Sequence, residues 1–95
     1  MPEYRTWITV AGLSFDDEAA WEPFISALEE RHAELGPILS WENGGKDALA
    51  VLATDAPDEA EAARVCADAV VDALHAAGLG DRYPAALRVG DAVYA

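Results

Sequence analysis

The sequence predicts an α+β fold in which two helices cover one face of a four-stranded antiparallel sheet. Segments with strand-like alternation and segments with helical spacing follow one another in the order strand, helix, strand, strand, helix, strand. A glycine-rich turn joins the second and third strands, which indicates a hairpin. The chain has 95 residues, 53% of them hydrophobic, which suits one modest core and is too short for two. We therefore expect residues 1–95 to form a single domain.

The first strand is expected at residues 4–11, YRTWITVA, which are rich in β-branched and aromatic residues. Its alternation places Ile8 and Val10 on one side and Trp7 and Thr9 on the other.

Helical spacing replaces this alternation in residues 16–35. Ser14 or Asp16 is the expected N-cap. Pro23 would remove a hydrogen bond from a helix interior, so we expect a short turn first and the main helix to begin with Pro23 in its first turn. Gly36 suits its C-terminal end. The apolar stripe consists of Trp21, Phe24, Ile25, Leu28 and Leu35.

Residues 37–42 and 47–54 predict the second and third strands. Between them, Asn43 and Gly44 supply the two positive-φ residues of a type I′ turn. A glycine pair before Lys46 also suggests a phosphate-binding loop. That loop requires wider glycine spacing, a hydroxyl residue after the lysine and a helix behind it, and the sequence has none of these. The hairpin is the favoured interpretation.

The second helix is expected to begin at Pro57, with Cys66 on its apolar stripe and Gly78 just past its end. Residues 85–94 predict the last strand, with Leu87, Val89 and Val93 on one face and a possible bulge at Gly90. The resulting β-α-β-β-α-β order is that of a ferredoxin-like sandwich. Right-handed crossovers would place strands 1 and 3 in the centre and strands 2 and 4 at the edges.

The composition excludes several classes of partner. Acidic residues outnumber basic ones 18 to 6, giving a net charge of −12 that repels nucleic acid and anionic membranes. No apolar run is long enough to span a bilayer, and the N-terminus lacks the pattern of a signal peptide. With a single cysteine, which suits a reducing compartment, the expected location is cytoplasmic.

No catalytic, cofactor-binding or metal-binding residue is predicted. The sequence contains no C-x-x-C, no dinucleotide fingerprint and no nucleophilic Ser-His-acid spacing, and Cys66 is expected in the core. A metal site can be imagined at His75 with Asp68 and Asp72, but an ordinary solvated pair is favoured. His32 is expected only to interact with the helix dipole. Acids near residue 16 lack a calcium-loop pattern.

Both faces of the expected sheet carry large apolar side chains, although two helices can cover only one. Ile38, Leu49 and Val51 fall on one face of the hairpin, and Leu39, Trp41, Ala50 and Leu52 fall on the other. An uncovered apolar face predicts a homodimer. The residues assigned to this ligand or dimer face are Trp7, Leu39, Trp41, Leu52 and Arg88.

Arg88 shares its side of the last strand with Ala86, Gly90 and Ala92. An arginine above small residues, flanked by Trp7 and Trp41, would suit a small aromatic carboxylate. Pairing of Arg88 with a nearby acid is the favoured alternative.

The functional expectation is a small, non-catalytic, dimeric module that binds a partner protein or a small regulatory ligand. The alternative is a small dimeric α/β-barrel-type enzyme, similar to a monooxygenase or isomerase, acting on an apolar substrate between sheet and helices. The two differ in whether a closed pocket contains polar groups with perturbed pKa values.

Overall fold

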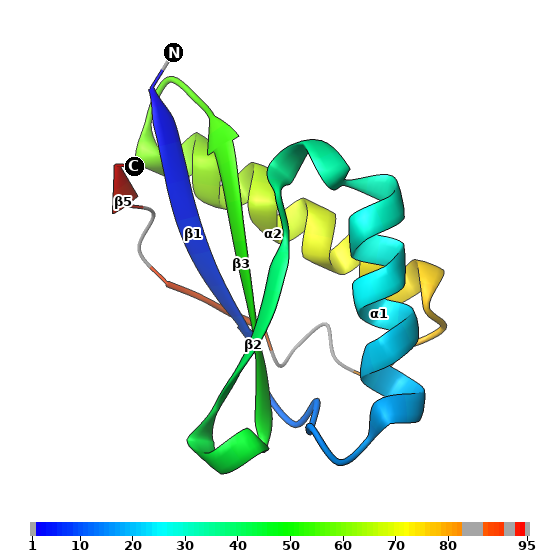
Figure 1. Cartoon of the computed structure of the whole chain (residues 1–95). Coiled ribbons are helices and arrows are strands. Elements are labelled where there is room, and N and C mark those ends of the chain that lie inside the picture. Colours follow the sequence, from blue (N-terminus) through cyan, green and yellow to red (C-terminus); the bar gives the residue numbers. More distant parts are fainter. Residues whose placement is uncertain (1, 83–86, 91–92, 95) are drawn as a thin grey trace.

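A computed structural model describes residues 2–82, 87–90 and 93–94. The strands form an antiparallel sheet in the order β2-β3-β1-β4, and β5 also pairs with β1 (Figure 1). As predicted, β1 and β3 are central, with β2 and β4 at the edges. The elements are β1 (Glu3–Val10), α1 (Glu18–Arg31), the 3₁₀ turn η1 (Ala33–Leu35), β2 (Ile38–Glu42), the 3₁₀ turn η2 (Asn43–Gly45), β3 (Asp47–Asp55), α2 (Glu59–Ala76), β4 (Leu87–Val89) and β5 (Val93–Tyr94).

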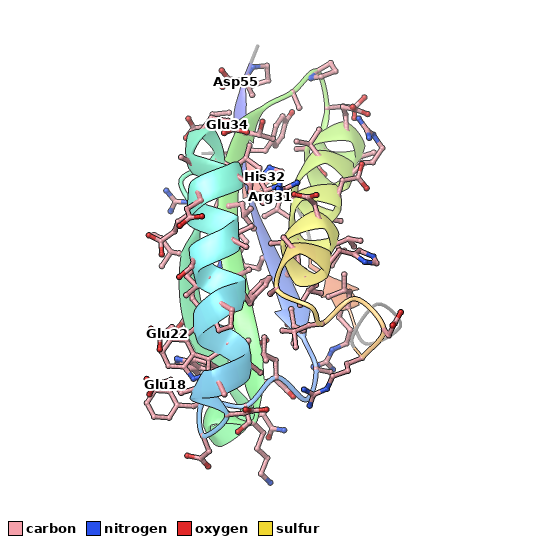
Figure 2. The ribbon with its side chains drawn as sticks, turned by 90° about the vertical axis from the view of Figure 1, so that its right-hand side faces the viewer. Glu18, Glu22, Arg31, His32, Glu34 and Asp55 are labelled. Atoms are coloured by element: carbon pink, nitrogen blue, oxygen red, sulfur yellow. The ribbon has the colours of Figure 1, made fainter. Side chains whose placement is uncertain are left out.

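Both helices pack against the same face of the sheet, as Figure 2 shows from the helix side. Alternate residues of the central strands point into this layer, and they meet the apolar stripes of α1 and α2. The layer excludes water, since its largest side chains are almost completely buried. They include Ile8, Val10, Leu13, Phe24, Leu28, Leu52, Val70 and Leu74.

Helix α1 begins at Glu18, so the prediction that the main helix starts around Pro23 is wrong. Asp17 is the N-cap, rather than Ser14 or Asp16. Pro23 removes the hydrogen bond that the carbonyl of Ala19 would accept, but both residues lie on the exposed side of the helix, where water can reach that carbonyl. Burial of the other side of the helix offsets the cost. The residues buried there are Ala20, Phe24 and Leu28.

The predicted hairpin is confirmed, with its turn centred one residue later. Asn43 and Gly44 have the predicted positive φ, 53° and 66°, and Gly45 adds a third at 86°. The Lys46 N–H donates to the Asn43 carbonyl at 3.3 Å, which centres the turn on Gly44 and Gly45. Glu42 and Asp47 form the last strand pair. A one-residue move of the turn centre changes the register by two, which leaves every side chain on its predicted face.

The expected last strand is interrupted near Gly90. Strand β4 pairs with the second half of β1, with Val89 opposite Ile8, whereas β5 pairs with its beginning, with Val93 opposite Arg5. The two pairings therefore differ in register by one residue, and the residues that directly follow the predicted bulge at Gly90 lie outside the described part of the chain. The single face predicted for Leu87, Val89 and Val93 therefore does not persist through the break.

The hydroxyl of Thr6 is a buried polar group without a satisfactory partner. Thr6 is 0% exposed, and its Oγ1 makes no hydrogen bond of ordinary geometry within the part of the chain that the structure describes. The group it meets is the thiol of Cys66, a weak hydrogen-bonding partner. A buried hydroxyl in this position reduces the stability of the fold.

We expect Thr6→Val to raise the free energy of unfolding by about 1 kcal/mol, because a methyl group replaces a poorly satisfied hydroxyl of the same shape. Thr9→Val on the same strand is the matched control. The Thr9 hydroxyl donates to Glu42, so this change should destabilise the protein by about 1 kcal/mol. Urea unfolding measures both. Equal losses in the two variants would contradict the interpretation of Thr6.

Candidate functional site

The structure divides the five residues predicted for a ligand or dimer face between the two faces of the sheet. Residues directly opposite each other in an antiparallel pair share a face. Trp7 lies opposite Val51, and Arg88 lies opposite Thr9, all on the face turned away from the helices. The other three lie on the helix-covered face: Leu39, Trp41 and Leu52.

The structure therefore corrects the predicted grouping of Leu39, Trp41 and Leu52 with Trp7. Leu52 is 1% exposed within the core, and the other two pack against that core. Alternation along one strand shows which of its residues share a face. The pairing between β1 and β3 decides which set lies under the helices, and the sequence does not reveal that pairing.

We call the face turned away from the helices the open face. Its large apolar side chains are Trp7, Ile38, Leu49 and Val51. Ile38 is 63% exposed, and the other three are partly exposed. No element of the described chain packs over them, so this apolar set is available to a partner.

Carboxylates lie at both ends of the open face. Glu3 pairs directly with Asp55 at one end, and Glu42 pairs with Asp47 at the other. Like charges opposite each other on neighbouring strands repel, so each pair needs a donor or a cation nearby. The hydroxyl of Thr9 donates to Glu42 at the hairpin end.

Arg88 forms an ion pair with an acidic residue. Its guanidinium lies 3.5 Å from the carboxylate of Asp47, which is 13% exposed and also accepts the Gly12 N–H at 2.9 Å. The structure thus favours the ion-pair interpretation of Arg88 over a free carboxylate site. Two of the small residues expected beneath it, Ala86 and Ala92, lie outside the described residues.

Arg5, which the sequence analysis did not single out, lies on the open face opposite Ala53 and two residues before Trp7. It is exposed and makes no ion pair with any described residue. A cation without an acidic partner among the described residues is unusual in a chain with three times as many acids as bases. The sequence signal that could have revealed it is the spacing of two residues between Arg5 and Trp7, which places both on the same face of the strand.

Three aromatic rings form a second surface feature, which we call the aromatic corner: Phe15, Trp21 and Trp41. Phe15 stacks on Trp21 with centroids 6.2 Å apart, and Trp41 meets the other two edge-on at 5.3 and 5.6 Å. Trp41 was predicted for the dimer face and lies here instead. Phe15 is 54% exposed, so the corner closes the end of the core and also presents a ring to solvent.

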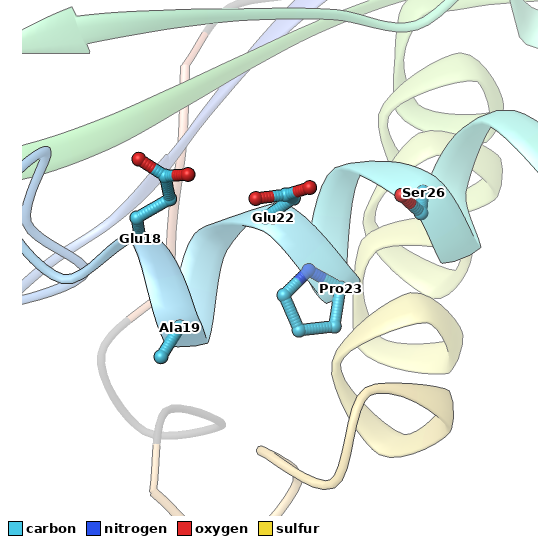
Figure 3. A pocket seen from close by; sticks show the side chains of 5 residues that line it. All are labelled: Glu18, Ala19, Glu22, Pro23 and Ser26. Atoms are coloured by element: carbon cyan, nitrogen blue, oxygen red, sulfur yellow. The ribbon is translucent and has the colours of Figure 1, made fainter.

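A hollow of about 430 Å³ lies on the outer surface of α1, the helix that contributes Trp21 to this corner. Glu18 and Glu22 stand on one side of it and point the same way (Figure 3). The remaining lining residues are Ala19, Pro23 and Ser26.

A charged cluster links the two helices. Asp72 on α2 accepts two hydrogen bonds from Arg31, at 2.8 and 3.0 Å, and lies 2.7 Å from Nε2 of His32. Arg31 is the last residue of α1 and His32 is its C-cap, and both lie on the side of α1 that faces α2 (Figure 2). Hydrogen bonds from Arg31 and then His32 lower the pKa of Asp72 to about 2. His32 therefore does more than interact with the helix dipole.

The two acids expected beside His75 form ion pairs with other residues. Asp72 binds Arg31 and His32, and Asp68 pairs with Arg64 at 2.8 Å. Among the described residues, no group of three or more histidine, cysteine and acidic side chains is arranged to hold a metal ion. Cys66 is 0% exposed, and burial raises the pKa of its thiol, as expected for a core cysteine.

Comparisons with protein-family models, with curated proteins and with solved structures give no match to this chain. In the described part of the chain, none of the helices combines the length and the apolar character needed to cross a membrane. Arguments about function therefore depend on the geometry of this chain alone.

The Asp72 cluster predicts a pH-dependent contribution to stability. The folded-state pKa, about 2, is below the ordinary value of 3.8, so the contribution is present above about pH 4 and is lost as the pH falls through 2. We expect Asp72→Asn to be less stable than the parent at pH 7, with a difference that shrinks below pH 4. Urea unfolding at several pH values measures this difference.

Glu29→Gln is the matched control, because it removes one carboxylate from an exposed position of α1 that makes no ion pair with any described residue. It corrects for the general effect of lowering the charge of a strongly acidic chain. An Asp72→Asn penalty that is the same at pH 7 and pH 2 would show that the ion pairs contribute nothing.

Proposed function

We propose that this chain is a ferredoxin-like βαββαβ sandwich that acts as a non-catalytic module, dimerising through its open face and binding a partner protein or a small regulatory ligand. The observation that carries the proposal is the apolar set Trp7, Ile38, Leu49 and Val51 on a sheet face that no described element covers. A solvated antiparallel face normally alternates to polar residues.

The area of this apolar set supports a second copy as the occupant. Each 100 Å² of apolar surface buried between two copies contributes on the order of 2.5 kcal/mol gross at about 25 cal/mol per Å², before association entropy and side-chain ordering are subtracted. A two-fold axis through the centre of the face would bury the same residues on both copies and close the assembly.

The charges determine the conditions under which dimers form. Two copies, each with a net charge of −12, repel each other, and salt screens this repulsion over roughly 10 Å at 0.1 M. Arg5, which pairs with no acid in the described part of the chain, offers one cation on the open face, but the repulsion between the two net charges outweighs this single attraction. Dimerisation should therefore strengthen as the ionic strength rises.

The alternative of a small enzyme has less support. It requires a cavity between sheet and helices for an apolar substrate. In the described structure that space is occupied by side chains with exposures near zero, among them Phe24, Leu52 and Val70. The open face and the surface grooves remain as places for a ligand.

We expect the parent protein to be a dimer at about 100 μM in sedimentation velocity and native mass spectrometry, and Trp7→Asp or Ile38→Asp to weaken the dimer by roughly 30-fold or more, as for interface hot spots. Ser26→Asp, on the exposed surface of α1, adds the same charge and should leave the dimer intact. Leu52→Asp should unfold the chain, because Leu52 is 1% exposed. A monomeric parent in about 0.5 M salt would overturn the proposal.

A further inference from the structure

We propose that the aromatic corner, together with Glu18 and Glu22, is a docking surface for an arginine-containing basic peptide segment of a partner protein. The corner lies where the start of α1 meets β2 and the hairpin, on the helix side of the sheet. It is separate from the open face, so it does not depend on dimerisation.

Phe15 is exposed and yet held firmly. Its N–H donates to the carbonyl of Gly45 at 2.8 Å, and its own carbonyl accepts the indole N–H of Trp21 at 2.8 Å. The ring also contacts Trp21 and Trp41. An ordered aromatic side chain loses little conformational entropy when a partner covers it, which is a property of interface hot spots.

Glu18 and Glu22 supply negative charge in the first turns of α1, three residues before and one residue after Trp21. They are one turn apart on α1, and like charges at this spacing destabilise a helix slightly. Neither makes an ion pair with any described residue, whereas Arg31, Arg64 and Arg88 are each paired with other acids. A cation bound between the two carboxylates would relieve their repulsion.

The two features select the chemistry of the partner. A guanidinium group is planar, stacks on aromatic faces and forms paired hydrogen bonds with carboxylates. An arginine-containing segment can stack a guanidinium on the exposed ring of Phe15 and pair with Glu18 and Glu22, whose side chains point the same way (Figure 3). Lysine provides a single point charge and less stacking, and anionic ligands are repelled. The geometry therefore favours arginine over lysine.

The test uses the full chain and two synthetic peptides, acetyl-Gly-Arg-Gly-Arg-Gly-amide and its lysine counterpart. Binding is followed by tryptophan fluorescence and by the indole N–H signal of Trp21 in two-dimensional NMR. We expect the arginine peptide to bind at least about 3-fold more tightly than the lysine peptide, with shifts concentrated at Phe15, Glu18, Trp21 and Glu22.

Two variants and a matched control separate local recognition from general attraction to an acidic protein. Glu18→Gln/Glu22→Gln should weaken binding about 10-fold, and Phe15→Ala about 3-fold. Glu29→Gln/Glu30→Gln removes the same charge from the other end of α1 and should change affinity less than 2-fold, an effect on the order of weak surface charges. Circular dichroism establishes that each variant is folded.

Equal weakening by the two double variants would overturn the proposal, because it would mean that net charge alone attracts the peptide. Equal affinity for the arginine and lysine peptides, with Phe15→Ala unchanged, would also overturn it. Shifts confined to Trp7 would place the peptide on the open face instead.

Discussion

The antiparallel pairing of β1 with β3 determines where the other elements lie. It extends along the whole of β1, from Glu3 opposite Asp55 to Val10 opposite Ala48. This register places Ile8 and Val10 under the helices and turns Trp7 outward, so it creates both the core and the open face. A register shifted by one residue would expose half of the core and bury Arg5 and the neighbouring acids. Burial on one face and charge at the ends of the other therefore support the same pairing.

Much of this architecture follows from local patterns in the sequence. Alternation indicates the strands, glycines at residues 44 and 45 permit the hairpin, and the helical spacing of Cys66, Val70 and Leu74 identifies the buried side of α2. These signals are local, because neighbouring residues share one element. The start of α2 lies two residues later than the predicted Pro57, because Asp58 is the N-cap and its side chain accepts the Glu61 N–H.

The surface features depend on contacts between distant segments, and the sequence alone does not specify them. The aromatic corner joins Phe15 and Trp21 to Trp41 through the packing of a loop and a helix against an edge strand. The pairing of His32 with Asp72 depends on the position of α1 relative to α2 along their axes. Pro23 shows the same limitation, because burial of the opposite side of α1 outweighs the local preference against proline in a helix interior.

The burial of Cys66 has a kinetic consequence. The thiol lies at 0% exposure between α2 and the sheet, and burial keeps it protonated by raising its pKa. A thiol reagent can reach it only when α2 separates from the sheet, and the reagent reacts with the deprotonated sulfur. The rate of alkylation under native conditions therefore reports how often this helix opens. It is also the only cysteine in the chain, so the signal comes from a single, known position in the core.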